Sequence, residues 1–210
     1  MFMKRIFSVL IAVFAGVAAF AQTTEEIFAR MEQAMQGQQD KGLYMVMEMK
    51  IPILGTAGTQ AWVLGDKTKM IISGKGASST IFLDGKTQWT YNPDKNEIEI
   101  ANQTKTSTSS NPQDNTEMLT GITDGYDITL KSETAEAWNF VCKKSKTNKN
   151  KDDPKTMDVS IAKNTYYPKS LSTKASGITI TMRDFHFDVT EKDVTFNQSD
   201  YPNAKVIDKR

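Results

Sequence analysis

The chain has 210 residues, a formal net charge of +1, one histidine (His186) and one cysteine (Cys142). This near-neutral charge argues against a nucleic-acid-binding protein, which needs a strong basic excess. One cysteine cannot form an internal disulfide, and one cysteine with one histidine nearly excludes a metal site built from these residues. We predict no metal and no cofactor.

Residues 1–21 have the pattern of an export signal. A charged start (Lys4, Arg5) is followed by an apolar run and by a small-x-small motif that ends at Ala21. The apolar run is shorter than the roughly 20 residues that a membrane span needs, so we favour cleavage after Ala21 over an anchoring helix. The prediction is an exported protein without a membrane anchor, whose mature chain, 22–210, forms a single domain.

An amphipathic helix is predicted directly after the signal, over residues 23–36. Thr23 or Thr24 can cap its start, and Gly37 ends it. The apolar residues fall on one stripe at helical spacing, so the helix must cover an apolar surface. The stripe consists of Ile27, Phe28, Met31, Ala34 and Met35.

After Gly42 the apolar residues alternate with polar ones, which predicts β-strands. A first strand over 43–51 is followed by two strands around the turn Gly65-Asp66, and by three strands within 79–101. A polar loop at 102–117 and a short helix near Met118–Ile122 follow. Four or five more strands are then predicted, at 126–133, 138–147, 155–163, 168–175 and 177–188. The pattern predicts a mainly β fold, with a meandering antiparallel sheet of about ten to eleven strands.

The stretch "LDGKTQWTYNP" at 83–93 carries the strongest turn signals. Asp84-Gly85 suits a two-residue hairpin turn of type I′, because both residues tolerate a positive φ. Such a turn places Phe82 on the same face of the sheet as Trp89.

The next turn has the sequence Asn-Pro-Asp-Lys-Asn. A four-residue loop from Pro93 to Asn96, with Asn96 in the left-handed region, places Tyr91 opposite Ile98. The same register places Trp89 opposite Ile100, so that these rings and aliphatic side chains share one face.

These patterns predict one face of a curved sheet that carries large apolar side chains. An ordinary core under the N-terminal helix is the alternative interpretation, because apolar stripes are usually core. We favour a lipid-binding cavity, because methionine suits the binding of varied apolar ligands and two helices cover a sheet of about ten strands only sparsely. The predicted lining is Met45, Met47, Met49, Trp62, Leu64, Phe82, Trp89, Tyr91, Ile98 and Ile100. The predicted lid over this lining is Ile27, Phe28, Met31 and Met35.

The hairpin "DGKTQWTYNP" at 84–93 resembles the signature hairpin of the LolA family of periplasmic carriers for outer-membrane lipoproteins. The similarity extends to "AWV" at 61–63, to "FNQSDYPNAKVID" at 196–208 and to the order of elements along the mature chain. The resemblance implies an open half-barrel with the N-terminal helix and a short second helix as its lid. Members of the family have an arginine after the Trp-Val strand, where this chain has Lys67, a candidate lid contact without the fixed donor fork of a guanidinium.

This resemblance also implies a function. It implies a soluble periplasmic carrier, acting as a monomer, that shields the acyl chains of lipoproteins in a hydrophobic cavity. The implied partners are acylated lipoproteins, an inner-membrane lipoprotein-releasing transporter and an outer-membrane acceptor. The alternative is a periplasmic lipid or lipoprotein sensor on the same fold that regulates a protein partner.

An enzyme is a weaker alternative. Cys142 and His186 are the only residues that can form a thiol–imidazole pair, yet each fits an ordinary strand position, so we predict no catalytic residue. The lysine-rich stretch 142–155 is best interpreted as a solvated hairpin tip, with a docking patch for an acidic partner as the alternative.

Overall fold

The computed structural model describes residues 22–74, 77–103, 125–151, 153–175 and 177–210. The predicted export signal, most of the predicted polar loop and the helix predicted near Met118–Ile122 lie outside these residues. Within the described ranges, no helix is both long enough and apolar enough to cross a membrane.

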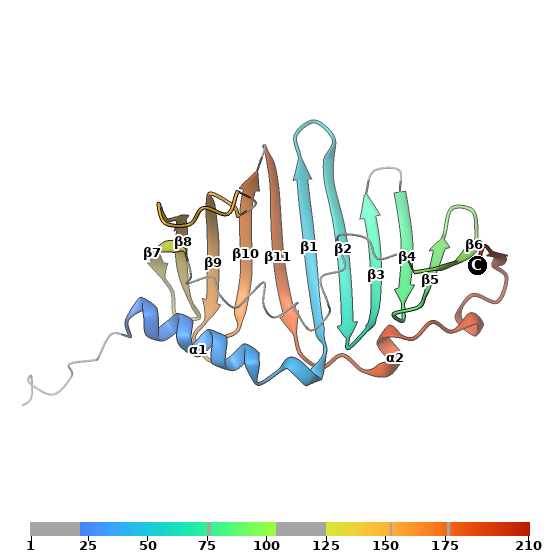
Figure 1. Cartoon of the computed structure of the whole chain (residues 1–210), viewed down its shortest axis with the longest axis horizontal. Coiled ribbons are helices and arrows are strands. Elements are labelled where there is room, and N and C mark those ends of the chain that lie inside the picture. The colour runs from blue at the N-terminus through green and yellow to red at the C-terminus, as the bar shows by residue number, and fades with distance from the viewer. Residues whose placement is uncertain (1–21, 75–76, 104–124, 152, 176) are drawn as a thin grey trace, which may run out of the picture.

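The strands in the described part of the chain form one sheet of twelve (Figure 1). The strand order is β12-β6-β5-β4-β3-β2-β1-β11-β10-β9-β8-β7. Among the described residues the edge strands β12 and β7 do not pair with each other, so the sheet is open. The strands are Leu43–Ile51 (β1), Gly55–Leu64 (β2), Lys67–Gly74 (β3), Ala77–Leu83 (β4), Thr87–Asn92 (β5), Glu97–Asn102 (β6), Tyr126–Glu133 (β7), Ala137–Lys144 (β8), Thr156–Ala162 (β9), Pro168–Ala175 (β10), Ile178–His186 (β11) and Lys205–Asp208 (β12). The predicted mainly β fold with an open sheet and an N-terminal helix is confirmed.

Two parts of this architecture were not predicted. β12 pairs with β6 in parallel, in a sheet whose other described pairs are antiparallel. A short helix, Glu191–Val194 (α2), lies between β11 and β12. The described 3₁₀ turns are Gln39–Lys41 (η1) and Gln198–Asp200 (η3).

The N-terminal helix, Thr24–Gln36 (α1), begins with a capping box. The Thr23 hydroxyl accepts a hydrogen bond from the Glu26 N–H at 3.2 Å, and the Thr23 N–H donates to the Glu26 carboxylate at 3.0 Å. The helix ends at Gly37, as predicted, and runs across one end of strands β7 to β11 (Figure 1).

The predicted stripe of α1 forms part of the main core. Ile27, Phe28, Met31 and Met35 are all buried, and the Phe28 ring meets the Phe140 ring edge-on at 5.0 Å. A helix of thirteen residues would be only marginally stable in isolation, so burial of this stripe against the sheet is the main reason that α1 is stable. The sheet contributes Leu43, Met45, Ala61, Trp138, Phe140, Cys142, Val159, Ile161, Leu171 and Phe185 to the same cluster.

The turn after β4 lies one residue later than predicted. The Asp84 N–H donates to the Thr87 carbonyl at 3.3 Å, so the two central residues are Gly85 and Lys86. The Asp84 carboxylate accepts the N–H groups of Lys86 (2.9 Å) and Thr87 (2.6 Å), which places Asp84 before the turn, and Gly85 has a φ of 86°. The shift moves the register by two residues, so no side chain changes face.

The loop after β5 has the predicted register. Asn96 has a positive φ of 50°. Tyr91 lies opposite Ile98, and Trp89 lies opposite Ile100. The predictions for this hairpin are therefore confirmed, because turn chemistry and apolar alternation agreed on a single register.

Candidate functional site

The sheet has two faces that we name by their side chains. The helix face carries Met45 and packs against α1, and the aromatic face carries Trp62, Phe82 and Trp89. Residues directly opposite each other in neighbouring strands share a face, so the observed register assigns each position to one of the two.

The predicted cavity lining is split between these faces, which corrects the prediction of a single lined face. In the β1–β2 pair, Met45 lies opposite Ala61 and Tyr44 lies opposite Trp62. The residues on the helix face are Met45, Met47 and Met49. The residues on the aromatic face are Trp62, Leu64, Phe82, Trp89, Tyr91, Ile98 and Ile100.

The length of the β1–β2 turn explains the error. Three residues separate Ile51 from its partner Gly55, so odd-numbered residues of β1 pair with odd-numbered residues of β2. A turn with one residue more or fewer would pair the odd-numbered residues of β1 with even-numbered residues of β2, so the methionines of β1 would share a face with Trp62. The segment "IPILG" contains both a proline and a glycine and does not specify which of these lengths forms.

The aromatic face at β4–β6 is filled by the C-terminal segment. Phe196 stacks on Trp89, with ring centroids 5.3 Å apart, and meets Phe82 edge-on at 5.6 Å. Tyr201 packs against Tyr91 at 4.5 Å. Phe82 is only 5% exposed, so this part of the predicted cavity is packed core and not a hollow.

Farther along the aromatic face, charged and aromatic residues lie side by side. The Lys69 ammonium lies 4.9 Å from the ring centroid of Trp62 and 5.6 Å from that of Phe82. These cation–π contacts place a lysine among the rings, on a face that was predicted to be apolar.

A pocket of about 370 Å³ opens beside these rings. Hydrogen bonds from the hydroxyl and the backbone N–H of Thr190 hold the pKa of Asp193, one of its lining residues, below the ordinary value. Two carboxylates in so small a lining disfavour an acyl chain, because an acyl chain bound there would take the charged groups out of water. The full lining is Tyr44, Trp62, His186, Asp188, Val189 and Asp193.

The helix face carries a second group of apolar side chains, all half-buried, which we call the methionine strip. Met47 lies opposite Met182, and Met49 lies opposite Ile180. Two of the strip's methionines, on β3 and β11, pack against the core cluster under α1, so the strip continues outward from the covered part of this face. The strip consists of Met47, Met49, Met70, Ile72, Ile81, Ile180 and Met182.

Five members of this strip are absent from the predicted lining. They are Met70 and Ile72 of β3, Ile81 of β4, and Ile180 and Met182 of β11, and only the two on β11 alternate strictly with polar residues. These segments are predicted as strands, but the face of each strand depends on pairing with a neighbour.

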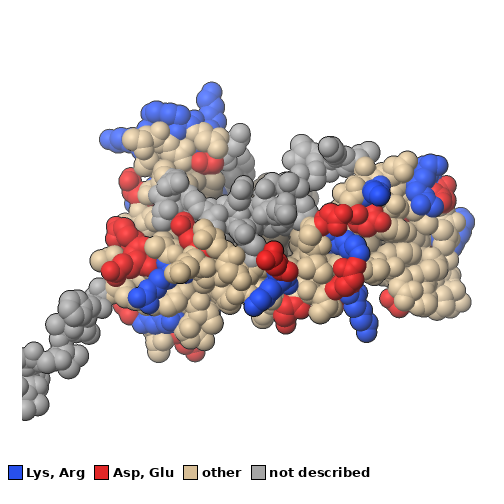
Figure 2. All heavy atoms as spheres, turned by 60° about the horizontal axis from the view of Figure 1, so that its bottom comes forward, with Lys and Arg blue, Asp and Glu red and all other residues tan. Residues whose placement is uncertain are grey.

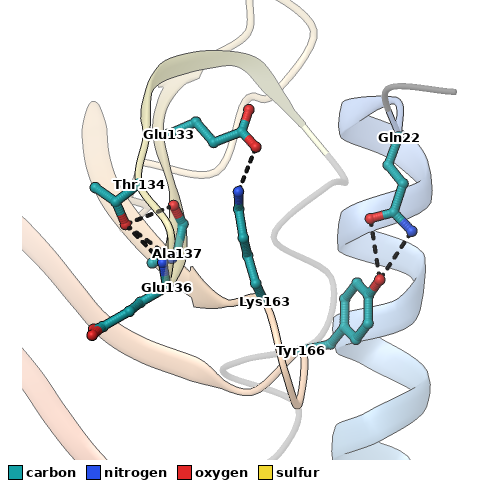
Figure 3. Close-up of polar contacts among 7 residues, drawn as sticks. All are labelled: Gln22, Glu133, Thr134, Glu136, Ala137, Lys163 and Tyr166. Atoms are coloured by element: carbon teal, nitrogen blue, oxygen red, sulfur yellow. Dashed lines mark hydrogen bonds and ion pairs between the residues drawn. The ribbon is translucent and has the colours of Figure 1, made fainter. Parts of the chain in front are cut away.

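The α1 helix is tied to the turn between β9 and β10 (Figure 3). The Tyr166 hydroxyl exchanges hydrogen bonds with the Gln22 amide at 2.9 Å and 3.1 Å, and it accepts one from Arg30 Nη1 at 3.0 Å. The Arg30 guanidinium also lies 5.2 Å from the centre of the Tyr166 ring. We call these three residues the Tyr166 latch.

Lys67, the candidate lid contact, lies away from α1. Its ammonium forms an ion pair with Glu191 of α2, and this hydrogen bond is the main reason that the pKa of Lys67 is raised. Lys67 therefore anchors the C-terminal segment, while the described contacts of α1 include the Tyr166 latch.

The two residues of the conceivable thiol–imidazole pair are separated. Cys142 lies on β8 in the core cluster under α1, and burial raises the pKa of its thiol to about 11. His186 lies on β11, exposed, with its ring 5.7 Å from that of Tyr44. Strands β9 and β10 lie between them, so this pair does not form.

Comparisons with known proteins identify no family for this chain. No protein-family model matches it, and no curated protein matches it in sequence. Among solved structures, it is similar to an uncharacterized conserved protein from Thermus thermophilus, with 14% identity, 90% of this chain and 100% of that chain covered, and a TM-score of 0.45.

Two further structures are similar at lower identity. MucB in complex with MucA(peri) is 9% identical, with 83% of this chain and 60% of that chain covered and a TM-score of 0.44. A LolA superfamily protein from Nitrosomonas europaea is 12% identical, with 84% and 99% covered and a TM-score of 0.33. All three TM-scores are below 0.5, so these likenesses do not bear on function.

Proposed function

We propose that this protein is a periplasmic carrier that binds the acyl chains of lipoproteins on the methionine strip. The observation that supports it is a strip of half-buried methionine and isoleucine side chains that continues outward from under α1. Methionine is unbranched and polarizable, so a methionine-rich surface adapts to flexible apolar ligands.

The free energy gained by burying an acyl chain is similar to that gained by burying the apolar side chains of α1. At about 0.8 kcal/mol per methylene, an acyl chain of about 16 carbons costs on the order of 12 kcal/mol to expose to water. The four buried side chains of α1 contribute on the order of 6–12 kcal/mol, at roughly 1.5–3 kcal/mol each. Because the two amounts are comparable, an acyl chain can displace α1, and α1 can close again when the chain leaves.

Carriage of this kind involves no bond making or breaking. We therefore propose a binding protein and not an enzyme. The strip offers only thioether and hydrocarbon groups, which shield an acyl chain from water without acting on its ester or amide bond.

Native mass spectrometry of the protein, extracted from the periplasm without detergent, tests the proposal. We expect a population whose added mass equals an acylated lipoprotein or a lipid. The double variant Met47→Gln with Met49→Gln should lose this population, because it makes the strip polar while keeping side-chain length.

A matched double variant on the other face controls for general destabilisation. Leu64→Gln with Ile71→Gln changes two half-buried apolar residues of the aromatic face. Loss of cargo in this variant, with retention in the Met47→Gln/Met49→Gln protein, contradicts acyl binding on the strip.

A crosslink tests the displacement of α1. In a Cys142→Ala background, Arg30→Cys and Tyr166→Cys are joined by a short bismaleimide, and uptake of a fluorescent acyl probe should fall strongly. A crosslink between Glu97→Cys and Lys205→Cys, which are paired residues of β6 and β12, should leave uptake unchanged. Equal uptake in both crosslinked proteins would show that α1 is not the lid.

Transfer distinguishes a carrier from a sensor. A loaded carrier should release its lipoprotein to outer-membrane vesicles within one incubation. Retention of the lipid together with capture of a regulatory protein would support the sensor instead.

A further inference from the structure

The turn between β1 and β2 presents two large apolar side chains to solvent. The exposed fraction is 102% for Ile53 and 65% for Leu54. The Leu54 N–H donates to the Pro52 carbonyl at 2.8 Å, and Ile53 has a φ of 69°, which is a γ-turn conformation that strains a β-branched residue. Glycine or asparagine would adopt this backbone more easily, so the fold alone does not account for an isoleucine here.

Several turns gather at the same end of the sheet. The β10–β11 turn lies against this one, with Gly177 beside Pro52. Strands β8 to β11, β1 and β2 are successive antiparallel neighbours, so the loop 145–155 between β8 and β9 also lies at this end (Figure 1). We call this end, with its turns 52–54 and 145–155, the tip end.

Lysines accumulate at the tip end, while the described acids there are Asp127 and Asp153. Figure 2 shows basic side chains gathered on the lobe at its upper left, on the side where Figure 1 places the loop 145–155. The lysines are Lys50, Lys143, Lys144, Lys146, Lys149, Lys151, Lys155 and Lys174.

The pairing of lysines differs between the two ends of the sheet. Within the described ranges, none of the tip-end lysines forms an ion pair with a carboxylate. At the opposite end, Lys67, Lys163 and Lys169 each pair with a glutamate. The tip end therefore combines uncompensated positive charge with an exposed apolar turn.

We propose that the tip end docks on the surface of an anionic phospholipid bilayer, with Ile53 and Leu54 inserted below the headgroups. Two apolar side chains on a convex turn suit a fluid surface that opens around them. Lysines spread over several strands suit a diffuse layer of negative charge rather than one compact acidic site. A few inserted side chains together with a basic patch give reversible membrane binding.

This inference stands whether or not the methionine strip carries acyl chains. The mature protein is therefore tested with bare vesicles, without a lipoprotein. We expect it to co-sediment with vesicles of phosphatidylethanolamine and phosphatidylglycerol, to bind phosphatidylcholine vesicles weakly, and to dissociate as salt is raised.

Two sets of variants separate the contribution of the inserted apolar side chains from that of the lysines. Ile53→Ser with Leu54→Ser should lower the partition coefficient by roughly tenfold or more, since both inserted side chains lose their apolar character. The control is Leu130→Ser with Val206→Ser, the other exposed large apolar residues in the described part of the chain. It should bind as the unmodified protein does.

A second pair of variants tests the charge. Neutralising three lysines of the loop, at 146, 149 and 151, to glutamine should weaken binding and flatten its salt dependence. The control neutralises Lys41, Lys86 and Lys192, which lie elsewhere on the protein, and should leave binding unchanged.

A direct contact measurement completes the test. In a Cys142→Ala background, an environment-sensitive dye on Ile53→Cys should shift to the blue when vesicles are added, and the same dye on Val206→Cys should not. Failure of the unmodified protein to bind anionic vesicles, or equal binding by the tip double variant, overturns the proposal. If the tip double variant loses binding to a protein partner but still binds vesicles, the proposal is overturned as well. Acyl-probe uptake, measured in the same variants, reports separately on the proposed function.

Discussion

Tyr44 lies directly opposite Trp62 across β1 and β2, with ring centroids 4.9 Å apart. This pairing sends the methionines of β1 to one face of the sheet and the rings of β2, β4 and β5 to the other. As a result, the aromatic side chains hold the C-terminal segment, and the methionines extend the surface under α1.

The three tryptophans report on the two faces. Trp138 lies in the cluster under α1, while Trp62 and Trp89 lie on the aromatic face. In single-tryptophan variants made by Trp→Phe changes, a brominated acyl chain should quench the fluorescence of Trp138 and leave Trp62 and Trp89 nearly unchanged. Strong quenching of Trp89 instead would place the acyl chain on the aromatic face.

Phe196 is expected to stabilise the fold without binding cargo. Phe196→Ala removes the contacts with Trp89 and Phe82, and should lower the free energy of unfolding by about 2–3 kcal/mol, less than for a fully buried ring. Urea unfolding measures this change. Val206→Ala, an exposed position in the same segment, should change it by less than about 0.5 kcal/mol. Acyl-probe uptake by folded Phe196→Ala protein should be retained, and its loss would implicate the C-terminal segment in binding.

The Tyr166 hydroxyl is expected to slow the opening of α1. Tyr166→Phe keeps the ring but removes the hydrogen bonds to Gln22 and Arg30, which contribute about 0.5–1.5 kcal/mol net. Hydrogen exchange of the α1 amides should therefore become roughly three- to tenfold faster. Tyr167→Phe is the neighbouring control and should leave this exchange unchanged. Equal rates in both variants would mean that the latch does not hold the helix.

Cys142 should make stability fall at alkaline pH. The thiol has a pKa of 9.0 in a free chain, and burial raises it to about 11 in the folded protein. Between these values the unfolded chain releases a proton that the folded chain retains, so the free energy of unfolding decreases as pH rises, by roughly 2–3 kcal/mol in total. Below about pH 9 the thiol makes no pH-dependent contribution.

The same unfolding experiment on Cys142→Ala isolates this effect. The difference between the two proteins should change with pH only in the alkaline window, because all other titrating groups are shared. A constant difference across that window would mean that the thiol ionises equally in both states.

Elements with strong local signals were predictable. Thr23 caps α1, Gly37 ends it, and its apolar stripe is buried as its spacing requires. Asn96 takes the left-handed conformation predicted for the loop after β5, and the register of that hairpin follows from it.

Elements whose signals are distant were not predictable. β12 pairs with β6 although about 100 residues separate them in the chain, and four residues carry too little pattern to reveal a strand. Phe196 and Tyr201 carry no sign in the sequence that they cover the rings of β4 and β5. Tyr166 likewise has no sequence signal that links it to α1.

The sequence by itself determined which residues form the helix and most strands, and that their apolar side chains alternate, because these properties depend on neighbours only a few positions away. Only the tertiary structure decided which face of each strand meets α1 and which meets the C-terminal segment. One residue more or fewer in the turn after Ile51 would reverse that assignment, and the register across strands is therefore set by turn length and long-range packing together.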